Sequence, residues 1–474
     1  MDPLQLRRIG LRRGFLKKAA AGIGAIALAD LLPAAETAGP LAPKRPHFPG
    51  KAKNVIFLFM EGGPSQYELF DEKPALTRYH GKPLSSEITK NLKLAFIKPT
   101  ASVMASRFRF RPHGQCGMHL SELLPHTGAL ADDLCLVRSM HTDAVNHHPG
   151  QLALFTGHTQ FGRPTMGAWV LYGLGSESQS LPGFVVLTSG RGTSGGASNF
   201  ASGFLPSHYQ GTVFRDSGDP LLYLSNPPGI TAESQRLALD LIGDLNKRRL
   251  AESADAEIAS RIASYELAFR MQMAGPELMD LSKEDARTRA LYGIDDPDPD
   301  TRQFASNCLL ARRMVERGVR FILMMDSSWD DHTQINTKLP KRCEKIDRAT
   351  AALLTDLKQR GMLESTLVVW GGEFGRTPMV EIRNASDAGD AGRDHNPNAY
   401  SMWLAGGGIK GGQVIGETDE LGLSITRDPV HVHDLQATIL HCLGFDHTRL
   451  TFRSSGRDFR LTDVGGHVVE KMIL

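Results

Sequence analysis

The stretch NVIFLFM at residues 54–60 constrains the fold more than any other part of the sequence. Six apolar residues follow Asn54 without interruption, and branched and aromatic side chains dominate them. A strand with one face in water alternates apolar and polar residues, whereas an unbroken run is typical of a strand buried on both faces. Residues 54–60 therefore predict a central strand of a parallel sheet.

Other short apolar runs predict further strands of the same sheet. They lie at residues 134–140, 184–187, 319–325, 366–370 and 401–404. Helical periodicity fills several of the gaps between these runs, and strands that alternate with helices indicate a parallel sheet with crossover helices. The prediction is a doubly wound, mostly parallel α/β sheet with helices on both faces.

Three predicted helices show how the gaps are filled. Ile346, Leu353 and Leu357 share one helical face that ends before Gly361, and residues 234–249 and 253–273 predict two more helices. We expect one domain over residues 54–474, with a less regular insertion around 190–300. Its glycine- and serine-rich tract TSGRGTSGGASNFASG predicts a surface loop.

The N-terminal 35 residues predict export. Basic residues that include Arg12 and Arg13 precede an apolar run too short to span a membrane well, which is the pattern of a twin-arginine signal peptide. We expect a periplasmic or cell-surface protein without a stable membrane span once the signal is removed. An uncleaved amphipathic anchor is the alternative. Residues 36–53 predict a proline-rich, extended and solvated linker.

Charge and cysteine content exclude several classes of protein. The formal net charge of the chain is +2, and the basic residues of the first 35 positions account for that excess, so nothing favours nucleic acid as a partner. The five cysteines contain no CxxC pair, which argues against a disulfide framework and against a thiolate zinc site.

Polar residues follow several of the predicted strands, at the sheet edge where ligands gather in open parallel sheets. The strand ends supply carboxylates and, at two of them, histidine. The candidate metal ligands there are Glu61, Asp331, His332, Glu373, Asp394 and His395. Such a mixed set suits a divalent cation such as zinc, manganese or calcium. Each residue alone has a simpler explanation, as a helix N-cap or as a hydrogen bond within a loop.

Long strings of the sequence resemble a known family. FLFMEGGPSQYELFDEKP, HHPGQLALFTGH, GEFGRTP, GRDHNP and AGGGIKGGQVIGETDELG are similar to the exported, sulfatase-like family called domain of unknown function 1501. The wider pattern resembles the alkaline phosphatase and sulfatase superfamily over most of the chain after residue 35. The resemblance implies an alkaline phosphatase-like α/β fold.

The stretch HHPGQLALFTG departs from the sulfatase helix that it resembles, which begins Cys-x-Pro-x-Arg. His147 falls at the nucleophile position and Gln151 replaces the arginine, so the formylglycine chemistry of sulfatases is excluded. The resemblance also places Glu61 where the superfamily has an aspartate ligand, and Phe374 after Glu373 where a histidine is usual. It implies a single ion, or a pair of ions with altered ligands.

Three roles remain open for the histidine pair. His147 or His148 could bind metal, since the helix N-terminus favours the neutral imidazole. His147 could instead be a nucleophile that forms a covalent intermediate. The pair could also only cap and pack the helix. Arg376 has two alternatives, to bind a substrate oxyanion or to pair with Glu373.

The function expected from these residues is metal-dependent hydrolysis of a phosphate or sulfate ester outside the cytoplasm. Trp329 and Trp403 follow or flank the ligand loops and could stack on a sulfated or phosphorylated sugar, although core packing is the commoner use of tryptophan. The competing hypothesis is a catalytically inactive sulfatase-like protein that binds a polysaccharide or a partner protein at the cell surface.

Overall fold

The computed structural model of the chain describes residues 40–90, 94–190, 192–215, 226–253, 255–383 and 389–474. The predicted signal peptide at 1–35 lies outside these residues. Among the residues described, no helix is both long and apolar enough to cross a membrane.

Nine strands form the central sheet of the described chain. They are β1 (Asn54–Met60), β4 (Leu134–His141), β5 (Phe184–Ser189), β6 (Thr212–Phe214), β7 (Phe321–Asp326), β8 (Thr366–Gly371), β11 (Tyr400–Ala405), β12 (Gln413–Ile415) and β15 (Val430–His431). Their order is β12-β4-β11-β8-β1-β7-β5-β6, and β15 also pairs with β4. Only β11 runs antiparallel to its neighbours in this sheet, so the predicted mostly parallel α/β sheet is confirmed.

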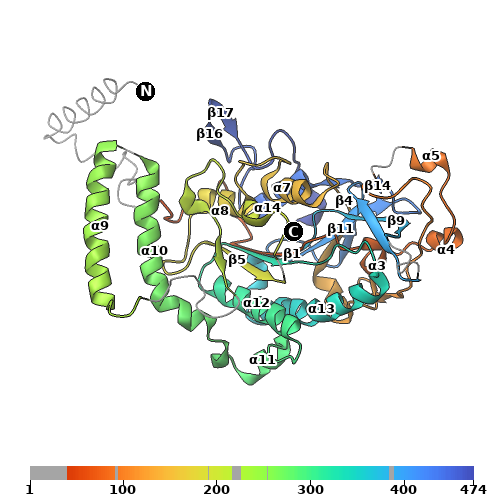
Figure 1. Cartoon of the computed structure of the whole chain (residues 1–474), viewed down its shortest axis with the longest axis horizontal. Coiled ribbons are helices and arrows are strands. Elements are labelled where there is room, and N and C mark those ends of the chain that lie inside the picture. Colours follow the sequence, from red (N-terminus) through yellow and green to blue (C-terminus); the bar gives the residue numbers. More distant parts are fainter. Residues whose placement is uncertain (1–39, 91–93, 191, 216–225, 254, 384–388) are drawn as a thin grey trace.

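Helices cover both faces of the sheet (Figure 1). α12 (Pro299–Glu316) and α13 (Ile335–Gln359) pack on one face, and α7 (His147–Thr156), α8 (Met166–Leu174) and α14 (Val432–Cys442) on the other. Ile56 and Leu58 of β1 belong to the core on the α12 and α13 face, whereas Phe57 and Phe59 belong to the core on the opposite face. β1 is therefore buried on both faces, as its uninterrupted apolar run predicts.

The described chain has seven further α-helices and four further strand pairs. The helices are α3 (Gln66–Leu69), α4 (Ala75–Tyr79), α5 (Ser86–Thr89), α6 (Pro125–Gly128), α9 (Ala232–Ser253), α10 (Ala256–Met279) and α11 (Ala286–Tyr292). Four hairpins pair β2 (Phe110–His113) with β3 (Met118–Ser121), β9 (Gly375–Glu381) with β10 (Gly392–Asn396), β13 (Glu417–Thr418) with β14 (Ile425–Arg427), and β16 (Phe452–Ser454) with β17 (Arg457–Phe459).

The region around 190–300, which the sequence predicts to be less regular, contains two long helices. The two predicted helices are confirmed as α9 and α10, which form a long hairpin beside the sheet (Figure 1). The segment predicted as a solvated linker is attached to the body where it is described. Lys44 N donates to Leu174 O at 2.7 Å, and Ala52 N donates to Cys442 O at 2.9 Å.

The position of α7 is fixed at its C-terminal end. Gly157 ends the helix with φ of 69°, and a Cβ at this residue would overlap the carbonyl oxygen of Leu461. The Gly157 carbonyl oxygen accepts a hydrogen bond from His433 Nε2 at 2.9 Å. These two contacts anchor the C-terminal end of α7. Because the helix is rigid and ten residues long, they also set the position of His147 at its N-terminal end.

Candidate metal centre

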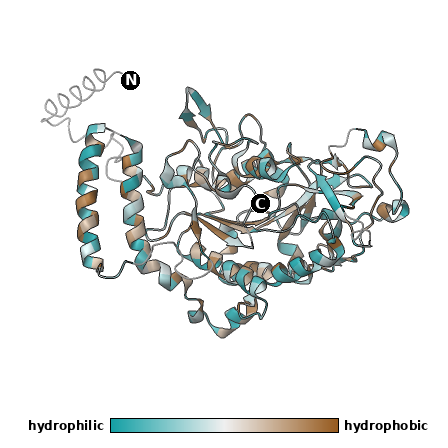
Figure 2. Ribbon diagram, viewed as in Figure 1, coloured by the Kyte–Doolittle hydropathy of each residue, from teal (hydrophilic) through white to brown (hydrophobic). Residues whose placement is uncertain are grey.

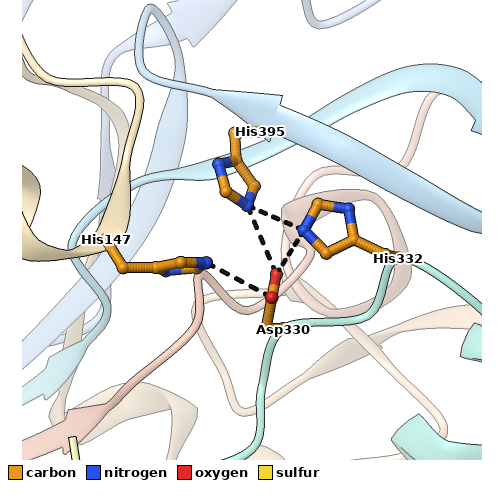
Figure 3. A group of neighbouring side chains, drawn as sticks. All are labelled: His147, Asp330, His332 and His395. Atoms are coloured by element: carbon orange, nitrogen blue, oxygen red, sulfur yellow. Dashed lines mark hydrogen bonds and ion pairs between the residues drawn. The ribbon is translucent and has the colours of Figure 1, made fainter. Parts of the chain in front are cut away.

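Four side chains converge beyond the carboxyl ends of the central strands, and they are His147, Asp330, His332 and His395 (Figure 3). Asp330 and His332 follow β7, and His147 begins α7 after β4. His395 lies on β10, just before β11. Because β11 runs antiparallel to its neighbours, its first residues lie at the same edge as the carboxyl ends of the other strands. The topology therefore brings four distant segments to one place.

The Nδ1 atoms of the two buried histidines are already committed. His395 Nδ1 lies 2.7 Å from the carbonyl oxygen of Val145, and His332 Nδ1 lies 2.5 Å from Glu381 Oε2. A carbonyl or carboxylate oxygen only accepts, so each Nδ1 carries the hydrogen. In the neutral ring this leaves a lone pair on each Nε2. Histidine ligands of metals are commonly oriented in this way by a carbonyl or a carboxylate.

The two Nε2 atoms lie 3.0 Å apart, and Asp330 Oδ1 lies 2.8 Å from that of His332 and 3.3 Å from that of His395. Two lone pairs and a carboxylate oxygen repel one another at such distances unless a proton or a metal cation lies between them. Tetrahedral zinc with bonds of about 2.0–2.1 Å to nitrogen places neighbouring donors about 3.3 Å apart. The three donors thus fit a small divalent cation, and two imidazoles favour zinc or manganese over calcium.

His147 links this group to a second carboxylate. Its Nδ1 donates to Glu373 Oε1 at 2.7 Å, and its Nε2 lies 3.3 Å from Asp330 Oδ2. Burial lowers the pKa of His147, but the hydrogen bonds to Asp330 and Glu373 outweigh burial and raise it to about 9. Burial likewise raises the pKa of Asp330, yet the bonds from the three histidines hold it well below its usual range. His147 is thus a cation between two carboxylates when no metal is bound.

Glu61 and Glu373 form a second candidate group with His147. Gly62 N donates to both Glu373 oxygens at 3.2 and 3.1 Å, and Gln151 Nε2 donates to Glu61 Oε1 at 3.1 Å. Burial, followed by the charge of Glu373, raises the pKa of Glu61. Gly62 has φ of 119°, and a Cβ there would overlap Asp330 N, so this close approach requires glycine.

The glycine- and serine-rich tract also reaches this second group. Ser194 N donates to Glu61 Oε1 at 3.2 Å, and Gly195 N donates to Gln151 Oε1 at 2.8 Å. The predicted surface loop therefore forms part of the wall of the site. Gln151, at the position of the sulfatase arginine, holds that loop against the helix that carries His147.

Arg376 is fully buried and packs against the loops that carry the site. Its guanidinium donates to the carbonyl oxygens of Gly62, Gly63, Trp329 and Arg393 and to Asp330 Oδ1, with 2.9 Å to Gly63, 3.3 Å to Trp329, 3.0 Å to Arg393 and 2.6 Å to Asp330. It makes no pair with Glu373 among the contacts of the described chain. These bonds give Arg376 a positioning role, in place of the predicted binding of a substrate oxyanion.

Three other predicted ligands point elsewhere. Asp331 pairs with Arg342 of α13, and its neighbour Asp330 takes the place at the metal centre. His148 packs edge-on against Phe161 with ring centroids 4.6 Å apart, and it is in none of the candidate groups of the described chain. Asp394 lies near His332 and Glu381. Its Oδ2, however, accepts backbone N–H bonds from residues 95–97 at 2.9, 2.9 and 3.3 Å.

Aromatic residues close the site from two sides. Phe96 is 59% exposed and its ring lies edge-on to His332 and His395, with centroids 5.1 and 5.4 Å away. Phe374 is buried and lies 5.1 Å from the His147 ring and 4.4 Å from the His395 ring. Trp329 and Trp403 are both 1% exposed, so they pack in the core and do not offer the suggested platform for a sugar.

Two residues of the site, Asp330 and Glu381, are not among the ligands that the sequence predicts. The sequence pattern favours Asp331 over Asp330, and it gives no reason to choose Glu381. The order of the two aspartates carries no signal about which one faces the site. Glu381, in contrast, ends β9 five residues after Arg376, and Arg376 is the register partner of His395 in the β9–β10 hairpin. The hairpin could have pointed to a carboxylate near the histidines.

The fold and the site define an α/β protein with an imidazole and carboxylate centre at the carboxyl edge of its sheet. Residues 52–473 match the family described as protein of unknown function (DUF1501), and the chain belongs to that family. No curated protein matches the chain at a significant level.

The chain is also similar to solved structures. PsFucS1 sulfatase from Pseudoalteromonas sp. is 14% identical over 83% of this chain and 68% of that chain, with a TM-score of 0.35. The lipoteichoic acid synthase LtaP from Listeria monocytogenes is 10% identical over 87% and 74%, with a TM-score of 0.35. Alkaline phosphatase from the Antarctic bacterium TAB5 is 12% identical over 78% and 95%, with a TM-score of 0.29.

Proposed function

We propose that the chain is a metal-dependent hydrolase of a phosphate or sulfate ester. The observation that carries the proposal is the meeting of the Nε2 atoms of His332 and His395 with Asp330 Oδ1, because these three atoms are spaced as ligands of one small cation. Three protein ligands leave a position open on a tetrahedral ion, which is typical of a catalytic rather than a structural site. A divalent cation in this site supplies Lewis-acid polarisation of an ester oxygen.

The chain's own contribution to the reaction is centred on His147. Glu373 Oε1 holds the Nδ1 hydrogen and thereby fixes the ring with Nε2 toward Asp330 and the two ligand histidines. A cation held by Asp330 would offset one of the two carboxylates that keep His147 protonated. The neutral Nε2 would then accept a proton from the attacking water, in the manner of a general base oriented by a carboxylate. Arg376 fixes Asp330, and Phe96 and Phe374 exclude water from one side of each ligand ring.

The choice of a phosphate or sulfate ester rests on the resemblance of HHPGQLALFTG to the sulfatase helix. In that resemblance His147 falls at the position of the sulfatase nucleophile. The proposed setting is outside the cytoplasm, after twin-arginine export, and it rests on the signal pattern of residues 1–35. A sulfated or phosphorylated carbohydrate is the substrate class that we propose for that setting.

The test is turnover of aryl phosphates and aryl sulfates by the purified chain with zinc or manganese. We expect activity that a chelator abolishes, and a His147→Gln variant about 10²–10³-fold slower with unchanged metal content. If His147→Gln loses the metal, this residue is a ligand and not a base. A wild-type chain that is loaded with metal and inactive on every ester supports the competing hypothesis of a binding protein.

Glu381 offers a separate prediction. Glu381→Gln removes the carboxylate that orients His332 but keeps the shape of the side chain, so we expect metal affinity to fall about 10–100-fold. Competition with a chromophoric chelator measures this affinity without any assay of activity. Arg383→Gln is the matched control, because Arg383 donates to Glu381 Oε1 at 2.8 Å and touches no ligand histidine. Equal affinity of Glu381→Gln and wild type would contradict the orienting role.

A further inference from the structure

One long face of α9 is left uncovered by the rest of the described chain. Figure 1 shows α9 on the outer side of the hairpin, with α10 between it and the sheet. Arg236 marks the face turned to α10, because it pairs with Glu266 at 2.7 Å and lies 4.8 Å from the centroid of the Phe269 ring. Leu237, Leu241 and Leu245 lie on another face and are 71%, 63% and 56% exposed.

These three leucines lie in a row that has a charged residue at each end. Glu233 precedes Leu237 by four residues, and Arg249 follows Leu245 by four. Together these residues form an i, i+4 ridge that winds about 40° around the helix axis at each step. Figure 2 shows apolar residues along α9 between hydrophilic ones. Glu233 and Arg249 are both exposed, and neither makes an ion pair with another described residue.

The row has a leucine on each side of Leu241 and opposite charges at its two ends. When a second copy of α9 crosses it in the antiparallel sense at about −50°, the angle that aligns such ridges, and Leu241 lies on the two-fold axis, Leu237 meets Leu245 of the other copy and Glu233 approaches its Arg249. Rows of residues four apart are the ridges that interdigitate in the commonest class of helix packing. A two-fold interface also requires a surface that is complementary to itself, which this row is.

We propose that this face of α9 is the interface of a homodimer of the full chain. Three exposed leucines on each copy lose contact with water there, and the two Glu233–Arg249 pairs fix the antiparallel direction. A contact made by one helix from each copy is small compared with obligate interfaces, so the dimer dissociates on dilution. The second copy fits better than other occupants because its charges match at both ends of the row.

The experiment is sedimentation equilibrium of the full chain over a range of concentrations. We expect the wild type to form dimers, and Leu241→Asp to raise the dissociation constant at least about a hundredfold, because both copies lose the central contact. Glu233→Arg and Arg249→Glu should each raise the constant about three- to tenfold. The double variant Glu233→Arg with Arg249→Glu should restore it, since the swapped charges again oppose each other.

Lys247→Glu is the matched control, because Lys247 is exposed on α9 but lies off the leucine row and pairs with Asp244. It should leave the dissociation constant unchanged. A wild type that remains monomeric at about 100 µM overturns the proposal. Its dissociation constant would then exceed that concentration, and the leucine row would stay exposed to water in most molecules. A dimer that survives Leu241→Asp also overturns it, as does failure of the charge swap to restore what each single reversal weakens. Binding of a monomeric chain to anionic lipid vesicles through Leu241 assigns the face to a membrane instead.

Discussion

Asp330→Asn is expected to remove most of the bound cation and to lower ester hydrolysis by about a thousandfold or more, because it replaces the carboxylate ligand by a neutral amide. Asp330 Oδ1 faces the Nε2 atoms of both ligand histidines, whereas Oδ2 faces His147. No other carboxylate of the described chain belongs to that group of donors. Metal content by mass spectrometry and initial rates with an aryl ester measure the two effects.

Asp331→Asn is the matched control for this prediction. Asp331 is adjacent in sequence and buried, but its carboxylate pairs with Arg342 on α13. Its replacement should lower stability and leave the metal content near that of wild type. If Asp331→Asn releases the metal and Asp330→Asn does not, the two aspartates have been assigned to the wrong roles.

Arg376→Met is expected to lower the free energy of unfolding by about 3–5 kcal/mol, because it leaves several buried carbonyl groups without their donor. The guanidinium joins the loop after β1, the loop after β7 and the strand β10 at one point. Urea unfolding followed by circular dichroism measures the change. Metal affinity should fall as well, since Asp330 loses the group that holds it.

Arg427→Met is the control for the loss of an arginine. Arg427 is 62% exposed and pairs with Glu417, so its replacement should change the unfolding free energy by less than about 1 kcal/mol. A loss below about 1 kcal/mol for Arg376→Met as well would mean that water replaces the guanidinium without cost. The role of Arg376 as the residue that joins these loops would then be wrong.

The fold could be predicted from the sequence because burial leaves a simple pattern. The strand β1 was predicted at residues 54–60 and the structure has it at Asn54–Met60, since every side chain of the run enters one of two cores. The long helix α13 was predicted from Ile346, Leu353 and Leu357, which pack on the sheet in the same core as Ile56. The reversed direction of β11 was not predictable, because its apolar run reads the same in either direction.

The candidate site could be predicted only in part. Polar residues that follow buried strands lie at the sheet edge where ligands bind. The sequence therefore predicts that Glu61, His332, Glu373 and His395 lie at or near the site. The choice between adjacent residues depends on side-chain direction, which differs by about 100° between neighbours on a helix. His147 and His148 therefore look alike in the sequence, although one meets Glu373 and the other meets Phe161.

The role of Arg376 depends on tertiary contacts that its sequence neighbours do not reveal. A basic residue three positions after Glu373 suggested a local pair or a substrate clamp. The side chain instead packs against the loops after β1 and β7, where the backbone carbonyls of Gly62 and Gly63 and the carboxylate of Asp330 accept its hydrogen bonds and the guanidinium itself is buried.

Anomalous diffraction from crystals of the full chain soaked with zinc tests the central claim most directly, because it locates the ion itself. The expected result is a peak within about 2.0–2.2 Å of Asp330 Oδ1 and of the Nε2 atoms of His332 and His395, absent from an otherwise identical His332→Ala, His395→Ala crystal. Crystals of the wild type that show no peak between these three atoms would contradict the account.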